Sequence, residues 1–274
     1  MRIGSRDFDL TGRVHVMGIL NVTPDSFSDG GRFLDPESAL DHALRMQEEG
    51  ADVIDVGAES TRPGSSPITE EEEWKRLLPV LRKVLPRIKI PVSIDTQKPG
   101  VADLSLQEGA AMINDVSALR REGMAEVAAR HRVPVILMHM RGEPPTMQRN
   151  PSYEDVVQEV LRFLQERIRF AVDRGIDRDK IMVDPGLGFG KRFEDNLALL
   201  NDLNEFGALR APIVVGASRK SFLRKIFGAD EKALWTGSAA AAVLAASKGA
   251  SILRVHDVAV TKAAIRLADP NSFL

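Results

Sequence analysis

Short apolar runs and longer segments of helical periodicity alternate along the chain. The runs are about five to seven residues long and mostly apolar, as is typical of strands buried on both faces of a parallel sheet. This pattern predicts eight strands, at 14–20, 52–56, 91–95, 111–115, 134–138, 180–184, 212–216 and 251–255. It also predicts eight helices, at 36–49, 70–85, 99–108, 122–131, 152–174, 194–206, 234–248 and 257–268.

Capping residues support several of these helix boundaries. Asp35 stands before a proline, so a cap precedes a proline at the first helical position. Thr69 and Glu72 match a capping box, and Ser152 and Asp155 match a weaker one. Helix ends are predicted at Gly50, Gly109 and Gly175.

Eight strand–helix units in about 250 residues are typical of the (β/α)₈ or TIM barrel, an α/β fold. A doubly wound open sheet is the alternative arrangement of such units. The regular alternation favours the barrel. No linker or low-complexity stretch divides the chain, so we expect residues 1–274 to form a single domain. We interpret the alanine-rich segment 237–246 as a tightly packed helix.

Charge and cysteine content exclude several classes of protein. The chain has 37 Lys and Arg against 39 Asp and Glu, a formal net charge of −2. No basic field therefore attracts it to nucleic acid or to an anionic membrane. It has no cysteine, which excludes disulfides, thiolate metal sites and a cysteine nucleophile. No apolar run reaches the ~18 residues of a membrane span and no signal segment is recognised, so a cytoplasmic protein is expected.

Polar residues gather where the predicted strands end, which is the active-site face of a barrel. Asp95, Asp115 and Asp184 each end an apolar run, and Asn114 precedes one of them. A buried ion pair or a helix cap is the alternative role for each carboxylate, because a desolvated charge needs partners. Together the four side chains suit a flat heterocycle whose amine and ring N–H groups donate in its plane.

Cationic residues follow the last two predicted strands. Arg219 and Lys220 come after the seventh strand, and Arg254 and His256 lie at the end of the eighth. Loops seven and eight are the usual phosphate-binding place in this fold. The sequence therefore predicts an anion site, to which a short helix beginning near Ser218 would add free backbone N–H groups. For Arg219 alone, a solvated charge at a helix end is the alternative.

Two predicted loops, 21–35 and 58–69, are unusually long and are candidates for lids. Plain surface loops are the alternative, although Phe27 and Arg62 would then have no evident use. The glycine-rich segment 184–191 fails the spacing of a P-loop and of a dinucleotide fingerprint. We interpret it as a tight loop that places Phe189 over the mouth of the barrel.

Histidine spacing gives no zinc motif. A metal, if used, is expected to be Mg²⁺, held by few protein oxygens and by substrate phosphate. His15, His42 and His131 are interpreted as structural or solvated, and the role of His139 is left open.

Eight segments match, in order, the motifs of one enzyme family. They are 17–31, 55–64, 93–96, 113–116, 138–140, 184–190, 216–221 and 254–257. The first reads MGILNVTPDSFSDGG and the second DVGAESTRPG, and both are long enough to be highly specific. On these motifs the sequence resembles the dihydropteroate synthase family of folate biosynthesis.

The resemblance implies a transferase of a pterinylmethyl group on a (β/α)₈ fold. The substrates would be 7,8-dihydropterin-6-ylmethyl diphosphate and p-aminobenzoate, and the products 7,8-dihydropteroate and pyrophosphate. It implies Mg²⁺ as cofactor and small molecules as the partners, with no nucleic acid and no membrane. Family members usually form homodimers through outer helices, so a homodimer is expected here, with 237–246 as one candidate contact.

The resemblance also assigns site residues by motif position. The pterin would be held or lined by Asp95, Asn114, Met138, Asp184, Phe189, Gly216 and Lys220. The diphosphate would be contacted by Thr61, Arg62, Arg219, Arg254 and His256. The p-aminobenzoate site would be shaped by Phe27, Thr61, Pro63, Lys220 and Ser221. Asn21 would reach the Mg²⁺. The residues implied in catalysis are Asp29, which would help to order a closed state, Asp95, Lys220, Arg254 and His256.

The implied mechanism breaks the C–O bond before attack and leaves a methylene cation stabilised by the pterin. Mg²⁺, Arg254 and His256 would neutralise the charge that grows on the diphosphate. Asp95 and Asp184 would favour positive charge on the pterin ring, and closed loops would exclude water. The arylamine attacks in its neutral form, so no dedicated general base is expected.

Three other functions share parts of this pattern. A pterin-dependent corrinoid methyltransferase has the barrel and the pterin carboxylates but handles no diphosphate. A non-catalytic pterin-binding paralogue would lose lid or anion residues. A barrel aldolase with a Schiff-base lysine rests on Lys220 alone.

Overall fold

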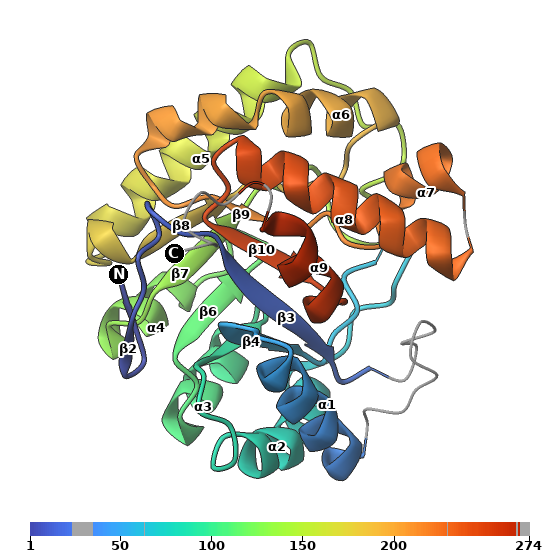
Figure 1. Cartoon of the computed structure of the whole chain (residues 1–274). Coiled ribbons are helices and arrows are strands. Elements are labelled where there is room, and N and C mark those ends of the chain that lie inside the picture. The colour runs from blue at the N-terminus through green and yellow to red at the C-terminus, as the bar shows by residue number, and fades with distance from the viewer. Residues whose placement is uncertain (24–34, 63, 229, 267, 269–274) are drawn as a thin grey trace.

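Parallel strands form the centre of the molecule and helices surround them (Figure 1). The computed structural model describes residues 1–23, 35–62, 64–228, 230–266 and 268. The central strands are β3 (His15–Asn21), β4 (Val53–Gly57), β5 (Val92–Asp95), β6 (Met112–Asp115), β7 (Val135–Met138), β8 (Ile181–Asp184), β9 (Val214–Val215) and β10 (Ile252–Val255).

The central sheet closes on itself. Its strands pair in the order β8-β7-β6-β5-β4-β3-β10-β9, and every pair is parallel. A parallel bridge between Val183 and Ile213 joins the two ends of this order. The predicted (β/α)₈ barrel is therefore confirmed, and the open doubly wound sheet is excluded.

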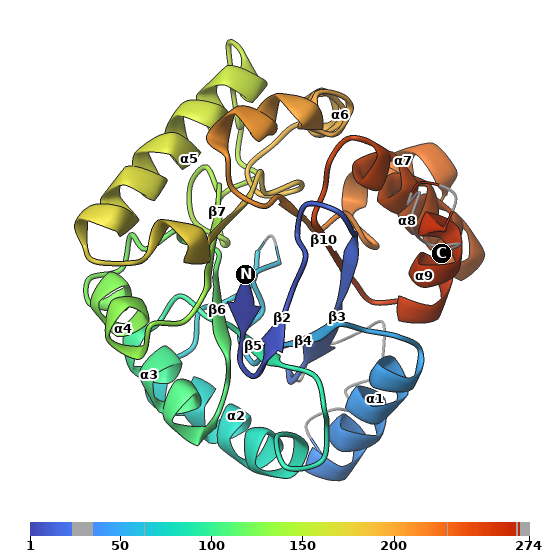
Figure 2. The same ribbon diagram turned by 60° about the vertical axis from the view of Figure 1, so that its left-hand side comes forward.

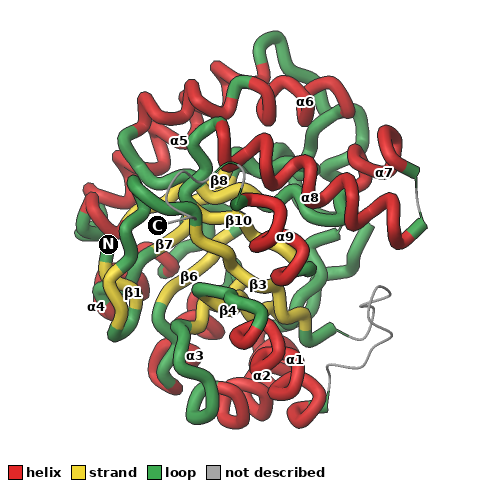
Figure 3. The backbone as a smooth tube through the Cα atoms, in the orientation of Figure 1, coloured by secondary structure: helices red, strands yellow, loops and turns green. Residues whose placement is uncertain are grey.

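Helices cover the outside of the barrel, as the red layer around the yellow strands in Figure 3 shows. They are α1 (Pro36–Glu48), α2 (Glu70–Val84), α3 (Pro99–Glu108), α4 (Met124–His131), α5 (Val156–Asp173), α6 (Phe193–Asn201), α7 (Ser221–Phe227), α8 (Glu231–Ser247) and α9 (Val258–Ile265). Short 3-10 helices span Arg178–Lys180 and Leu203–Leu209. Among the described helices, none combines the length and the apolar character that crossing a membrane requires.

Local capping chemistry sets several helix ends as predicted. The Thr69 hydroxyl accepts the Glu72 amide at 3.2 Å and begins α2, and Asp35 likewise accepts the Ser38 amide at 3.0 Å before α1. Gly109 ends α3 with a φ of 116°, a conformation that favours glycine. These boundaries follow from a few neighbouring residues, which explains why the sequence predicts them.

Other boundaries differ from the prediction. The helix predicted at 152–174 begins at Val156, because Asp155 accepts the Gln158 amide at 3.0 Å and Ser152 does not cap it. The short helix predicted from Ser218 is α7, which begins at Ser221. The α8 helix begins at Glu231, before the predicted start at 234.

A small N-terminal hairpin, which the apolar pattern did not predict, closes the amino-terminal end of the barrel. Its strands β1 (Arg2–Ile3) and β2 (Arg6–Asp7) are only two residues each. Figure 2 shows the hairpin lying across the ring of central strands. Its apolar residues pack on the interior of the barrel in a cluster of Ile3, Phe8, Leu10, Met17, Val53, Met112, Ile136, Met182, Val214 and Ile252. This end is a packed core, which leaves the carboxyl ends of the strands for a site.

Candidate functional site

The interior of the barrel changes from apolar to polar toward the carboxyl ends of its strands. The apolar layer against the hairpin includes Val53, Met112, Met182 and Ile252. Because side chains alternate along a strand, the residue two positions later points into the same interior. These later residues are Asp55, Asn114, Asp184 and Arg254. The tertiary fold thus gathers polar groups from different strands into one layer at the mouth.

Arg254 lies at the centre of a buried network in this layer. Its Nε donates to Asp55 Oδ2 at 2.6 Å, and its Nη2 donates to Asp95 Oδ2 at 2.6 Å. Asn114 Nδ2 donates to the same Asp55 oxygen at 2.9 Å. The Asp55 side chain is 0% exposed, and those of Asp95 and Arg254 are 10% and 19% exposed. Four strands are therefore tied together across the barrel by charge.

Burial governs the acid–base properties of this network. It raises the pKa of Asp95 to about 7, although Arg254 acts in the opposite direction. Burial would lower the pKa of Arg254, but Asp55 and Asp95 outweigh it and keep the guanidinium protonated. Among the described residues, the Oδ1 atoms of Asp55 and Asp95 are buried acceptors without a hydrogen-bond partner. A ligand with N–H donors would satisfy such acceptors.

Asp184, Phe189 and Lys220 form a second part of the site. Asp184 Oδ1 accepts the Gly186 amide at 2.6 Å, and burial raises the pKa of this carboxyl. Lys220 donates to the carbonyl of Leu187, and its Nζ lies 4.6 Å from the centre of the Phe189 ring. Burial lowers the pKa of Lys220 to about 8.

Small and apolar residues border the same space. Gly216 leaves room beside Lys220, since a β-carbon there would lie 3.6 Å from Lys220 Nζ. Met138 belongs to a cluster with Val116, Met140 and Met147, against which Phe189 packs. The predicted pterin residues are thus brought to one side of the mouth.

The cations predicted to bind an anion already have partners. Arg219 Nη2 lies 2.6 Å from Asp257 Oδ1, and each side chain is only 16% exposed, so a solvated charge at a helix end is wrong for Arg219. His256 Nδ1 lies 3.1 Å from Ser218 Oγ. Burial, with the charges of Arg219 and Arg254, lowers the pKa of His256 well below its usual value, so the ring is neutral. The two bonds of Arg254 use Nε and Nη2 and leave Nη1 for an anion.

The two long loops are only partly described. Thr61 is half-buried, whereas Arg62 and Ser221 are exposed. The Gly64 amide donates to the Pro144 carbonyl at 3.2 Å, which ties the second loop to the loop after β7. The predicted residues Phe27, Asp29 and Pro63 lie outside the described residues.

Asn21 ends β3 at the same mouth and is half-buried. Within the described residues, no group of three His, Cys, Asp or Glu side chains could hold a metal ion. One amide oxygen fits a Mg²⁺ ion that takes its other ligands from water and phosphate, which is the usual habit of this cation. The donor set therefore fits substrate-assisted Mg²⁺ and not a closed protein cage.

Two features of the site differ from what the sequence suggested. Asp55, which begins the motif at 55–64 and is not among the predicted site residues, is the most buried member of the Arg254 network. The sequence does contain a signal for this buried role, because a charged residue within the predicted strand 52–56 needs a partner. Asp115 has a local structural role and is not part of the polar layer, because its oxygens accept the Ser117 and Leu119 amides at 2.7 Å each.

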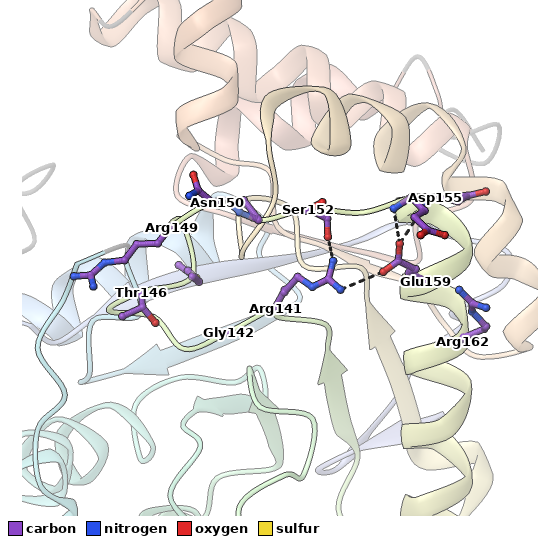
Figure 4. A pocket seen from close by; sticks show the side chains of 12 residues that line it. Arg141, Gly142, Thr146, Arg149, Asn150, Ser152, Asp155, Glu159 and Arg162 are labelled. Atoms are coloured by element: carbon purple, nitrogen blue, oxygen red, sulfur yellow. Dashed lines mark hydrogen bonds and ion pairs between the residues drawn. The ribbon is translucent and has the colours of Figure 1, made fainter.

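A hollow of about 880 Å³ lies elsewhere, over the loop between β7 and α5 (Figure 4). Its lining residues all fall within 141–162, and they include none of the strand-end groups. Arg141 crosses it to pair with Glu159 at 3.3 Å. Met147 belongs both to this lining and to the apolar cluster of Met138.

Comparisons with known proteins identify the family of the chain. A family model described as "Pterin binding enzyme" matches residues 17–256. A dihydropteroate synthase of Escherichia coli strain K12 is 46% identical over 255 residues, covering 93% of this chain and 90% of that protein.

Two crystal structures are similar over almost the whole chain. A Yersinia pestis dihydropteroate synthase with a sulfonamide drug complex has a TM-score of 0.95 at 42% identity, covering 100% of this chain and 99% of that one. A Xanthomonas albilineans dihydropteroate synthase in complex with 7,8-dihydropteroate has a TM-score of 0.86 at 45% identity, covering 96% and 95%. By motif, sequence and fold, the chain belongs to the dihydropteroate synthase family of pterin-binding enzymes.

Proposed function

We propose that the protein catalyses the dihydropteroate synthase reaction. It condenses 7,8-dihydropterin-6-ylmethyl diphosphate with p-aminobenzoate and releases 7,8-dihydropteroate and pyrophosphate. The observation that carries this proposal is the buried polar layer of Asp95, Asn114 and Asp184 beside Arg254 in a chain of this family. The similarity to a structure that holds 7,8-dihydropteroate supports the same product.

The pterin is recognised by acceptors in the plane of its ring. The amide nitrogen of Asn114 donates to Asp55, which leaves the side-chain oxygen of Asn114 as an acceptor for the pterin. The unpartnered Oδ1 of Asp95 is a second acceptor. Asp184 keeps one oxygen beyond its bond to the Gly186 amide. Met138, Phe189 and Gly216 supply the flat apolar boundary, with Lys220 at its edge.

Departure of the diphosphate is the step that needs electrostatic help. Arg254, through Nη1, together with Arg62 and Arg219 stabilises the negative charge as the C–O bond breaks. Neutral His256 and the hydroxyl of Thr61 donate hydrogen bonds to the leaving group. Asp95 and Asp184 stabilise the positive charge that spreads over the pterin. The amine nitrogen of p-aminobenzoate then forms the new C–N bond and loses a proton to solvent.

We propose that Mg²⁺ is bound at Asn21. When bound, this ion neutralises part of the charge on the diphosphate. Asn21 ends β3 at the mouth of the barrel, where the leaving diphosphate would lie. Binding of Mg²⁺ and pyrophosphate together is therefore expected to raise the melting temperature more than either one alone.

The p-aminobenzoate site is proposed at the rim of the mouth. Thr61, Lys220 and Ser221 come from loops after β4 and β9, and Phe27 and Pro63 complete the assignment by motif. Closure of the first two loops, with Asp29 ordering the closed state, would exclude water that otherwise traps the cation as an alcohol.

We propose a homodimer formed through α7, α8 and α9. Large apolar side chains on these helices are exposed: Ile226, Phe227, Trp235 and Val260. Trp235→Glu is expected to shift the protein from dimer to monomer in light scattering at micromolar concentration. Leu104→Glu is the matched control, because Leu104 is similarly exposed but lies on α3. Equal masses for both variants and the parent would reject this interface.

A pyrophosphate-release assay tests the proposed function. Release should require p-aminobenzoate and Mg²⁺, and dihydropteroate should form in equal amount. Release without the amine would mean that water captures the cation. Pterin binding without any release would favour the non-catalytic paralogue or the corrinoid methyltransferase instead. The single-domain organisation of 1–274 and the cytoplasmic location stay predictions.

A further inference from the structure

A buried lysine that forms no ion pair with a carboxylate of the described residues lies behind the pterin side of the mouth. Lys191 is 3% exposed and lies near the end of the loop between β8 and α6. Its Nζ lies 2.8 Å from the Gly186 carbonyl, 3.1 Å from the Phe189 carbonyl and 2.9 Å from Nδ1 of His139. Its hydrogen bonds within the described chain go to these acceptors and to the His139 carbonyl. None of the catalytic steps proposed above uses this lysine.

The loop before Lys191 is folded so that its acceptors converge. Gly186, Gly188 and Gly190 have φ values of 68°, 83° and 62°, which turn the chain tightly between β8 and α6. The Gly186 and Phe189 carbonyls consequently point at one place, where they would repel each other without a donor between them. The amine of a lysine carries more than one N–H group on a single nitrogen, so it can donate to both carbonyls from one point.

His139 fixes Lys191 from the other side. The histidine directly follows β7, and its ring meets Phe163 of α5 edge-on at 4.8 Å between centres. Burial and the neighbouring charge of Lys191 lower the pKa of His139 to about 2, so its ring is neutral. Lys191 thus joins β7, α5 and the β8–α6 loop.

The loop that Lys191 holds carries much of the pterin site. Phe189 lies in this loop, and so does Leu187, whose carbonyl accepts a hydrogen bond from Lys220. Asp184 stands at its start and accepts the Gly186 amide. A change in the path of this loop would therefore move three of the groups assigned to the pterin. The residues assigned to the diphosphate come from other loops and would stay in place.

We propose that Lys191 is a positioning residue for pterin binding, which gathers the Gly186 and Phe189 carbonyls and so fixes Phe189 and the seat of Lys220. This proposal deepens the proposed function and rests on it, because it assumes that the mouth binds a pterin. Lys191 does not touch the substrate. Replacing Lys191 should therefore weaken the affinity for the pterin and leave the affinity for the anion unchanged.

The test compares pterin and pyrophosphate affinities in matched variants. The probes are 6-hydroxymethylpterin, followed by fluorescence, and pyrophosphate with Mg²⁺, followed by calorimetry. Lys191→Met keeps the unbranched side chain up to the ε position and removes its donors. It should weaken pterin binding at least about tenfold and change pyrophosphate binding less than about twofold. Lys191→Arg, which keeps N–H donors at the end of a long side chain, should recover part of the loss.

Gln148→Ala is the control from the solvent side of the same loop. Gln148 Nε2 donates to the Gly188 carbonyl at 2.7 Å, but the residue is exposed. Its loss should change pterin binding less than about twofold, since water can replace an exposed donor. Catalytic assays of Lys191→Met should agree with the binding data. They should give a raised KM for the pterin diphosphate and an unchanged KM for p-aminobenzoate.

Three outcomes would overturn the proposal. Pterin binding by folded Lys191→Met within about twofold of the parent would mean that the loop needs no lysine. Equal weakening of pterin and pyrophosphate would indicate general destabilisation. If Lys191→Met fails to fold, hydrogen exchange in the unaltered protein decides: fast exchange of the Gly186, Gly188 and Phe189 amides before ligand is added would show that nothing holds the loop. An unaltered protein that binds no pterin would refute the proposed function instead.

Discussion

Replacing Arg254 by methionine would leave two carboxylates in the barrel without their counter-ion. Asp55 and Asp95 each lie 2.6 Å from the guanidinium, and both are almost completely buried. Removing one partner of a buried ion pair typically costs about 3–5 kcal/mol, because the remaining charge is desolvated and uncompensated. We therefore expect Arg254→Met to lower the free energy of unfolding by about 3–5 kcal/mol at pH 8.

This loss should depend on pH in a defined direction. Burial already raises the pKa of Asp95 to about 7, and removing Arg254 raises it further. A carboxyl whose pKa is higher in the folded than in the unfolded protein lowers the free energy of unfolding at pH values above its unfolded pKa. This loss shrinks as the pH falls toward the unfolded pKa. The variant should therefore become more stable from pH 8 to pH 5.5, by about 1.4 kcal/mol for each pH unit in which one carboxyl stays protonated only in the folded state.

Reversible urea unfolding followed by circular dichroism at pH 5.5 and pH 8 measures both quantities. Adding Asp55→Asn to the variant should restore stability at pH 8, because one uncompensated charge is then removed. An unfolding free energy within about 1 kcal/mol of the parent at pH 8 would refute the network as a buried ion pair. A loss of equal size at both pH values would refute the assignment to carboxylates.

Three further predictions concern other parts of the chain. Because burial lowers the pKa of Lys220 to about 8, an amine-selective acylating reagent should label Lys220 before surface lysines, with a rate midpoint near pH 8 by peptide mass spectrometry. Interactions of Asp52 with His15, with Lys262 and with the Val16 amide outweigh burial and hold the pKa of Asp52 below its usual range. Asp52→Asn should therefore cost about 2 kcal/mol at pH 7 in urea unfolding, and the difference should begin to shrink as the pH falls below about 4. Gly186→Ala should abolish pterin binding, since its β-carbon would lie 1.9 Å from the His139 carbonyl oxygen, whereas Gly207→Ala meets nothing within 4 Å and should bind normally.

The sequence alone was enough to predict the barrel and the type of site. Apolar runs and helical periodicity depend on which face of each element is buried, so they can be read within short windows. Caps such as Thr69 and Asp35 act over three residues, and their helix starts were predicted correctly. The β1–β2 hairpin was missed because strands of two residues carry no periodicity.

The partners within the site were decided only by the tertiary structure. The sequence places Asp95, Asn114 and Arg254 at strand ends, and in a barrel all strand ends meet at one mouth. The sequence does not show which cation pairs with which carboxylate. Arg254 is 199 residues from Asp55. Lys191 is 52 residues from His139. Such pairs exist because closure of the sheet brings distant strands and loops across one interior, where desolvation forces each buried charge or donor to find a partner.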